Sequence, residues 1–317
     1  MSFELRFAMI VLAAFAWSSV AGAGVVAALW RRRLATGPVD RAAALVRLRL
    51  LPPAIGVTVA GLAAMAFFRF EPRHADEQFG VVLASLAVTG GLFVAHAAVS
   101  LCRMWRQTRR TVRGWLDRAE PVTLDGISAP ALAINSAFPI VAVVGLFKPR
   151  LVIARSVLDA CGAGELRAIL AHEQGHIDRG DNLRRLLLGA APDVLAWLPV
   201  SRRIQAAWLQ AAEDAADDRA DRLGAEGRAL LAQALIRVAR LAAGRPPMSL
   251  PSSTLYRGET DNLDRRVRRL LAPVAPAGPA SRGRWLGGAV AGTLLAVALF
   301  ALETIHDALE AAVTYLP

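Results

Sequence analysis

Long apolar stretches interrupt the mixed pattern of hydrophobic and polar positions along the chain at four places. They cover residues 7–30, 50–68, 79–102 and 285–302. Each approaches the roughly 20 apolar residues that a helix needs to cross a bilayer. The glycines and alanines within them allow neighbouring helices to pack closely in a membrane. The pattern therefore predicts an α-helical membrane protein with four transmembrane helices, three of them before a long segment of mixed character and one after it.

The ends of the first two stretches indicate whether the first is cleaved and where the second helix begins. Small residues at 21–23 resemble the cleavage site of a secretory signal peptide, but a signal core usually has about 7–15 apolar residues and this stretch is longer. It also ends on arginines at 31–33, as a stop-transfer segment does, so we interpret it as a retained helix. The second stretch opens near Pro52 and Pro53, and we expect its helix to begin there because the first turn tolerates proline.

The basic residues follow the positive-inside rule. Arginine is concentrated in residues 31–49, 103–113 and 265–284, whereas acidic residues prevail in 69–78 and after 302. We therefore expect a multi-pass protein of the bacterial inner (cytoplasmic) membrane with both termini outside. This topology and contact with the lipid bilayer account for the net charge of +11, so we expect no direct binding of nucleic acid.

This topology divides the chain into three parts. Residues 1–102 hold three transmembrane helices, residues 103–284 form one cytoplasmic domain, and residues 285–317 hold the fourth transmembrane helix and a short external tail. Two cysteines, Cys102 and Cys161, are too few for a disulfide scaffold or a four-cysteine zinc site.

The cytoplasmic segment begins with short strands and continues with helices. Apolar or β-branched runs bounded by glycine and proline predict strands at residues 121–124, 131–134, 140–144 and 150–153. Apolar residues at helical spacing predict helices at 165–178, from Asn182 with Asp181 as its cap, at 202–223 and at 228–243. The segment is therefore expected to form an α+β domain.

Residues 172–176 read His-Glu-Gln-Gly-His. His172 and His176 lie about one turn apart on one helical face, so their imidazoles can bind one zinc ion at about 2.0–2.1 Å. Glu173 can reach a water beside that ion and act as general base, then pass the proton to the leaving amine. A helix preceded by strands favours this interpretation over two solvent-facing histidines.

A catalytic zinc usually takes a third protein ligand. The remaining histidines, His74, His96 and His306, lie in or beyond the predicted membrane spans, so the third ligand should be a carboxylate. Glu213 is the best candidate, and Asp217, one helical turn later, can accept a hydrogen bond from a ligand histidine. Taken alone, Glu213 and Asp217 are more simply interpreted as part of a solvent-exposed acidic helix face. The presence of the histidine pair makes the metal-binding interpretation the better one.

The sequence also resembles the membrane-embedded gluzincin peptidases typified by the β-lactam-sensing antirepressor receptors of bacteria. The matching positions are residues 147–153, residues 165–171, Arg179, Asp181, Asn182, Pro199, Trp208 and residues 265–271, together with the motif and acidic residues above. The resemblance implies a zincin-like α+β metallopeptidase domain inserted between transmembrane helices. It implies that His172, His176 and Glu213 bind one catalytic Zn²⁺, that Glu173 is the acid/base and that Asp217 supports the ligands.

The resemblance implies a membrane-bound zinc metalloendopeptidase that cuts a cytoplasmic protein, such as a transcriptional repressor. Well-known relatives carry an extracellular penicillin-binding domain after the last span, whereas this chain ends at Pro317, so we do not expect β-lactam sensing. One alternative is a zinc protease for membrane-protein quality control. Another is a membrane signal transducer that binds metal without cutting, which the presence of Glu173 disfavours. The sequence leaves the oligomeric state open.

Two expectations concern substrate binding. Tyr256 could stabilise the oxyanion of the tetrahedral intermediate, although a lone loop tyrosine is more often structural. Substrate backbone can pair with an exposed strand edge beside the active helix. The candidates for that edge are residues 140–144 and 150–153.

Overall fold

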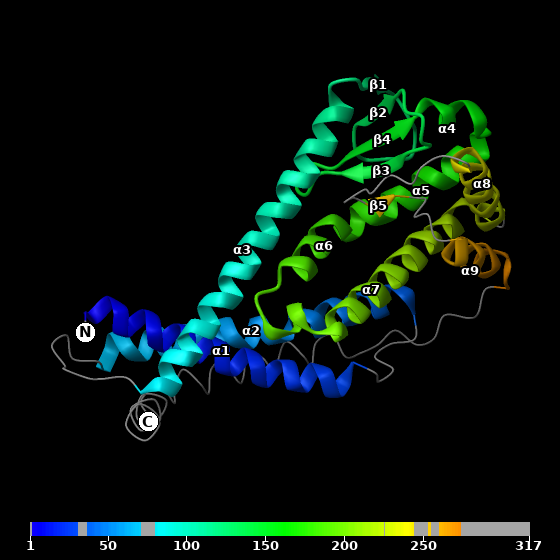
Figure 1. The fold of residues 1–317 in the computed structure, drawn as a ribbon. Coiled ribbons are helices and arrows are strands. Elements are labelled where there is room, and N and C mark those ends of the chain that lie inside the picture. The colour runs from blue at the N-terminus through cyan, green and yellow to red at the C-terminus, as the bar shows by residue number, and fades with distance from the viewer. Residues whose placement is uncertain are drawn as a thin grey trace.

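Most of the chain is helical, and a small mixed sheet follows the first three helices (Figure 1). The computed structural model describes residues 2–30, 37–70, 80–224, 226–243, 253–254 and 260–273. The predicted fourth span, residues 285–302, and Tyr256 lie outside these residues.

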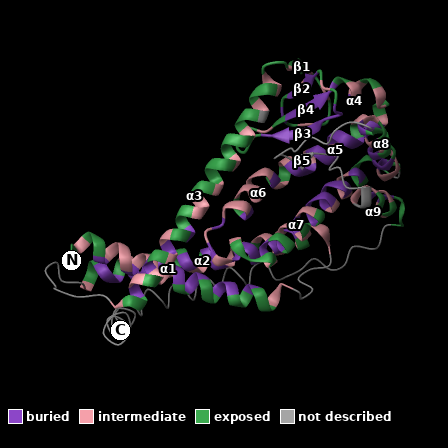
Figure 2. Cartoon of the chain, in the orientation of Figure 1, coloured by how far each residue is buried: buried purple, intermediate pink, exposed green. Residues whose placement is uncertain are grey.

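Three helices in the described part are long and apolar enough to cross a membrane: α1 (Phe3–Leu29), α2 (Pro38–Phe70) and α3 (Val81–Leu116). They contain the first three predicted spans. In Figure 1, α1 and α2 lie alongside each other, and α3 crosses them and extends to the sheet. Figure 2 shows that α3 is exposed along much of its length, as expected for a helix that contacts lipid.

Two helix boundaries differ from the sequence-based predictions. Helix α2 begins at Pro38, so Pro52 and Pro53 lie inside it and are buried, and the expected start at these prolines is wrong. A proline inside a helix removes a backbone hydrogen bond, and packing offsets this cost here: a Cβ added to Gly22 of α1 would lie 3.0 Å from the Pro52 Cα. Helix α3 continues beyond Cys102, so the arginine-rich stretch after it is helical.

The sheet has five strands in the order β1-β2-β4-β3-β5. Strands β2 and β4 are parallel, and the other neighbouring pairs are antiparallel. The strands are β1 (Glu120–Val122), β2 (Ala131–Ile134), β3 (Val141–Val144), β4 (Arg150–Ala154) and the two-residue β5 (Ser253–Thr254). Apart from Arg150 at the start of β4, every residue of the β-branched β3 and β4 is buried.

Helices follow the first four strands. They are α4 (Arg155–Ala160), α5 (Ala163–Arg179), α6 (Asp181–Ala190), the 3-10 helix η1 (Val194–Trp197), α7 (Pro199–Asp217), the 3-10 helix η2 (Asp218–Leu223), α8 (Gly227–Ala242) and α9 (Thr260–Leu271). The four predicted helices of this region correspond to α5, α6, α7 with η2, and α8. Helix α9 was not predicted, although its apolar residues Leu263, Val267 and Leu270 recur at helical spacing and pack into the same core as α8.

The sheet is covered on both faces. One face packs against α5 and α8, where Ile153 of β4 and Val143 of β3 join Ile169 of α5 and Leu235 of α8 in one apolar core. On the other face, Trp115 at the end of α3 packs against the core that includes Ile140 and Val152. The first membrane helices therefore reach the sheet through α3.

A second connection runs from α2 to the segment between α6 and α7. Arg49 of α2 and Asp193 form an ion pair whose side chains are 1 % and 0 % exposed. Arg49 Nε also donates a hydrogen bond to Ser201 Oγ, in the first turn of α7, at 3.0 Å. Apolar residues of α1 and α2 surround this contact together with Trp208 of α7. A buried, fully paired guanidinium thus joins the membrane helices to α7.

Removing one partner of this pair is expected to destabilise the protein by about 3–5 kcal/mol, because the other charge stays buried without compensation. We therefore expect Asp193→Ala to lower the thermal unfolding midpoint of the detergent-solubilised protein. The matched control is Asp264→Ala, whose partner Arg268 is 79 % exposed, and an exposed pair contributes only about 0–1 kcal/mol. Equal stability of the two variants would contradict the expectation.

Candidate metal centre

Helix α5 is fixed at both ends. The backbone N–H of Gly162 donates to the Glu165 carboxylate at 2.8 Å and so caps the beginning of the helix. The helix ends at Gly180, whose φ of 61° is in the left-handed region that favours glycine. Between these ends His172, Glu173 and His176 are all buried. The motif therefore lies on the inner face of a well-defined helix.

Helix α7 approaches α5 closely at the motif. A Cβ added to Gly175 would lie 3.2 Å from the Ala216 Cα, so the small residue permits this approach. Glu213 and Asp217 lie on the same part of α7 and are both buried. They do not form the solvated acidic face that this segment alone would suggest.

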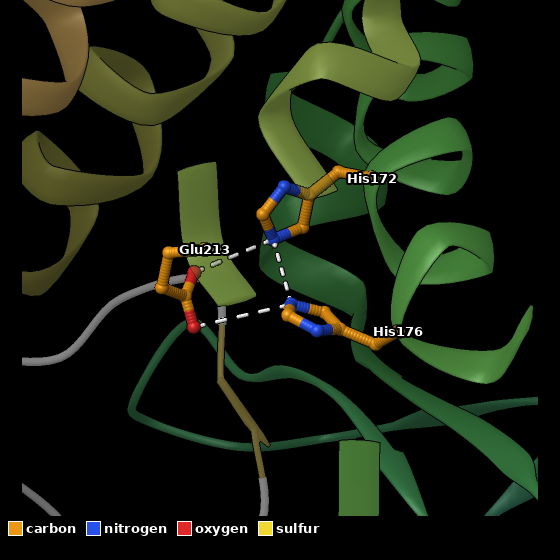
Figure 3. Close-up of side chains that lie close together, drawn as sticks. All are labelled: His172, His176 and Glu213. Carbon is orange, nitrogen blue, oxygen red and sulfur yellow. Dashed lines mark hydrogen bonds and ion pairs between the residues drawn. The ribbon is translucent and has the colours of Figure 1, made fainter. Parts of the chain in front are cut away.

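His172, His176 and Glu213 converge on one point (Figure 3). The two Nε2 atoms lie 3.2 Å apart. Glu213 Oε2 is 3.6 Å from His172 Nε2, and Glu213 Oε1 is 3.9 Å from His176 Nε2. In the described part of the chain, these three residues are the group whose ligand atoms are placed to hold a metal ion.

The donor set fits zinc. Ligand atoms that hold zinc at about 2.0–2.2 Å in a tetrahedron lie about 3.3–3.6 Å from one another. The 3.2 Å between the two Nε2 atoms and the 3.6 Å between Glu213 Oε2 and His172 Nε2 are close to this range. Two neutral imidazoles and one carboxylate are a common ligand set of catalytic zinc. His172 suits this role because burial lowers the pKa of its imidazole to about 4 and so keeps it neutral.

Each imidazole has a carboxylate behind it. His172 Nδ1 lies 2.9 Å from Asp217 Oδ1, and His176 Nδ1 lies 2.8 Å from Asp181 Oδ2. Such pairs fix the ring orientation and the tautomer that leaves Nε2 free for a metal. Asp181 had been expected to cap the following helix. Instead Gly180 precedes α6, and Asp181 is its first residue, with its carboxylate turned back to the motif.

Two arginines surround the carboxylates. Arg179 Nη2 donates to Asp181 Oδ2 at 2.9 Å and to the Ala212 carbonyl of α7 at 3.1 Å. Arg266 of α9 donates to both oxygens of Asp217, at 3.0 and 2.6 Å. Motif spacing gave no sign of the Arg266 contact. Its only signal was that residues 265–271 resemble a family segment.

Charge determines the protonation of the remaining groups. Burial raises the pKa of the Glu213 carboxyl, but the guanidinium of Arg266 and the two imidazoles outweigh it and hold this pKa below its ordinary value. Burial lowers the pKa of His176, but the hydrogen bond to Asp181 and the charge of Glu213 outweigh it and raise this pKa. Without a metal, His176 therefore holds a proton more firmly than an ordinary histidine.

Glu173 differs from the other acidic residues of the site. It is completely buried, and among the described residues neither of its carboxylate oxygens has a hydrogen-bond partner. Burial raises its pKa to about 7. A carboxyl group that titrates near neutral pH and has no partner can exchange a proton with a molecule that enters the site.

The substrate-binding expectations are not confirmed. Strand β4 lies between β2 and β3, so residues 150–153 are not an edge and that candidate is wrong. Strand β3 lies next to α5, and the Asn182 side chain of α6 donates to the carbonyls of Val143 and Gly145, each at 3.0 Å. Its other side pairs with β5, so residues 140–144 are not a free edge either and that candidate is also wrong. Tyr256 lies outside the described residues, so its role stays a prediction.

Comparison with known proteins agrees with this geometry. The model of the BlaR1 peptidase M56 family matches residues 15–270, which include most of the first three long helices, the sheet and all the metal-site residues named above. A comparison with curated protein sequences gave no match. The chain therefore belongs to the M56 peptidase family typified by BlaR1, a family of membrane-associated metallopeptidases.

Proposed function

We propose that the protein is a membrane-bound zinc endopeptidase that cuts a peptide bond in a cytoplasmic protein, such as a transcriptional repressor. The observation that carries this proposal is the convergence of His172, His176 and Glu213 beside the buried, unpartnered Glu173. Membership of a peptidase family supports hydrolysis. A transducer that binds metal without cutting has no use for such a carboxyl group.

In this proposal His172, His176 and Glu213 hold one zinc ion. Zinc would polarise the carbonyl of the scissile bond and make a water molecule more acidic. Asp181 is hydrogen-bonded to His176 Nδ1 and Asp217 lies 2.9 Å from His172 Nδ1, and these contacts keep both Nε2 atoms directed at the ion. These contacts organise the site before substrate arrives, so little rearrangement is needed during the reaction.

Glu173 performs the proton transfers. As a carboxylate it accepts a proton from the attacking water, and as a carboxylic acid it donates that proton to the amine that leaves when the C–N bond breaks. In the metal-free site burial raises the pKa of Glu173 to about 7, and a zinc ion nearby would favour the carboxylate, the form that takes the proton from water.

We further propose four transmembrane helices, both termini outside the cell membrane and a zincin-like protease domain in the cytoplasm. The three apolar helices and the distribution of arginine support this arrangement. A cytoplasmic domain is the condition for cutting a repressor.

Cysteine labelling can check the topology. In a Cys102→Ala, Cys161→Ala background, a membrane-impermeant reagent applied to intact cells is expected to label single cysteines at positions 76 and 307, but not at position 125. Permeabilised cells provide the control, because all three positions should then react. Labelling of position 125 in intact cells would place the domain outside and rule out a cytoplasmic substrate.

The substrate can be found with a variant that lacks the proposed base. Proteomes of strains carrying the wild-type protein or Glu173→Gln are compared for peptides with new termini. A regulator that is cut only in the wild-type strain supports the proposal. Many damaged membrane proteins accumulating in the variant strain would favour quality control, and identical proteomes under all stress conditions tested would contradict both forms of proteolysis.

A further inference from the structure

The four arginine side chains of helix α9 differ widely in how exposed they are to solvent. The side chains of Arg265, Arg268 and Arg269 are 31 %, 79 % and 26 % exposed, whereas that of Arg266 is 5 % exposed. Long charged side chains are seldom buried unless they are paired. Arg266 must therefore be held by specific partners.

Those partners belong to the metal centre. Arg266 Nε and Nη2 donate to the two oxygens of Asp217 in a bidentate contact, at 3.0 and 2.6 Å. Nη1 lies 3.3 Å from Glu213 Oε2. Asp217 Oδ1 is also 2.9 Å from His172 Nδ1. The Arg266 guanidinium therefore contacts the candidate ligand Glu213 directly, and it is linked to the candidate ligand His172 through the Asp217 carboxylate.

The neighbouring arginines Arg265 and Arg269 make contacts that hold α9 in place without reaching the metal ligands. Arg265 pairs with Asp214 of α7 at 2.7 Å, and Arg269 donates to the Asp214 carbonyl at 3.1 Å. These contacts hold α9 against α7 but reach none of the three candidate ligands. Arg265 and Arg266 are adjacent residues of the same type with partners on the same helix, so they form a matched pair for comparison.

We propose that Arg266 is a positioning residue of the metal centre, whose planar guanidinium fixes Glu213 and, through Asp217, the ring of His172. This inference rests on the proposed function, because it assumes that these residues bind zinc. A planar fork with two parallel N–H groups matches a carboxylate in a way that a lysine ammonium cannot. The proposed zinc site is therefore complete only when α9 is docked.

Two roles of Arg266 have to be separated. A positive charge near the ion repels it, so if Arg266 acted through charge alone, Arg266→Gln would bind zinc more tightly and Arg266→Lys would resemble the wild type. If Arg266 positions the ligands, Arg266→Lys weakens zinc binding although the charge is retained. The lysine variant is thus the decisive one.

The experiment uses the full-length protein in detergent, with zinc alone as the probe. Zinc affinity is measured by competition with a chromophoric chelator, and ligand geometry by the visible spectrum of the Co²⁺ form. We expect Arg266→Lys to lower zinc affinity about 10–100-fold, as loss of a residue that orients a metal ligand does, and to shift the Co²⁺ spectrum. Arg265→Lys should leave both unchanged. Wild-type affinity and spectrum in Arg266→Lys would overturn the proposal.

If Arg266→Lys folds poorly, the effect of zinc on its thermal unfolding midpoint still tests the proposal. The rise in unfolding midpoint on adding a fixed zinc concentration depends on the dissociation constant, so a positioning role predicts a smaller rise in Arg266→Lys than in Arg265→Lys. Midpoints lowered equally with and without zinc would show a merely structural role and overturn the proposal. A wild-type protein that binds no zinc would overturn the proposed function as well, whereas equal binding by wild type and Arg266→Lys would overturn this inference alone.

Discussion

Replacing Glu173 by glutamine is expected to lower the rate of peptide cleavage by about 10²–10⁴-fold, the usual contribution of a general acid–base residue, while leaving zinc binding intact. The substitution keeps the size of the side chain but removes its capacity to take up a proton. Neither Glu173 oxygen makes a hydrogen bond of ordinary geometry among the described residues, and an amide oxygen can still accept from the backbone N–H of Val143 nearby. The folded state should therefore tolerate the change.

The measurement compares cleavage of the identified substrate, zinc content and unfolding midpoint. Glu165→Gln is the matched control, since Glu165 is also a buried glutamate of α5 but binds Gly162 and Arg237 instead of facing the metal ligands. That control should lose some stability and keep its activity. Wild-type turnover by Glu173→Gln would show that Glu173 is not the base.

Removing the metal is expected to abolish cleavage completely and to lower the unfolding midpoint. The three ligands and their carboxylates are buried, so without an ion the charge of Glu213 is compensated by Arg266 and the imidazoles instead of by a divalent cation. Dialysis against a chelator, followed by stoichiometric Zn²⁺, should restore both activity and stability, whereas Mg²⁺ should not, because it prefers oxygen ligands in octahedral geometry.

Protons should compete with the metal. A metal must displace the proton of His176, whose pKa is raised in the metal-free site, so apparent zinc affinity is expected to fall as the pH drops below that pKa. His172→Ala should lose zinc, and His96→Ala, on the membrane helix α3, should keep it. Activity that survives complete metal removal would contradict a zinc mechanism.

Local patterns in the sequence predicted the parts of the site that lie on single helices. The i, i+4 spacing of the two histidines and of Glu213 and Asp217 is a property of one helix, and the structure places both pairs on inner faces. The first four strands were also predicted within one or two residues, because β-branched runs between glycines and prolines are local signals, whereas β5 was not predicted.

Contacts between distant segments were not predictable in the same way. The partner of His176 depends on the turn at Gly180, and the contact of Arg266 depends on how α9 packs against α7. The position of β4 inside the sheet depends on parallel pairing with β2, which no periodicity specifies. The prolines of α2 were misplaced because their burial inside a longer helix involves its close packing against α1, which no local pattern specifies.

Helix α9 is the last helix of the described chain and packs against η2 and α8. During synthesis it leaves the ribosome later than the helices that carry His172, His176 and Glu213. If Arg266 completes the metal centre, a growing chain has its ligands before it has the group that orients them. A newly made molecule would then become proteolytic only once α9 has docked at the end of domain folding.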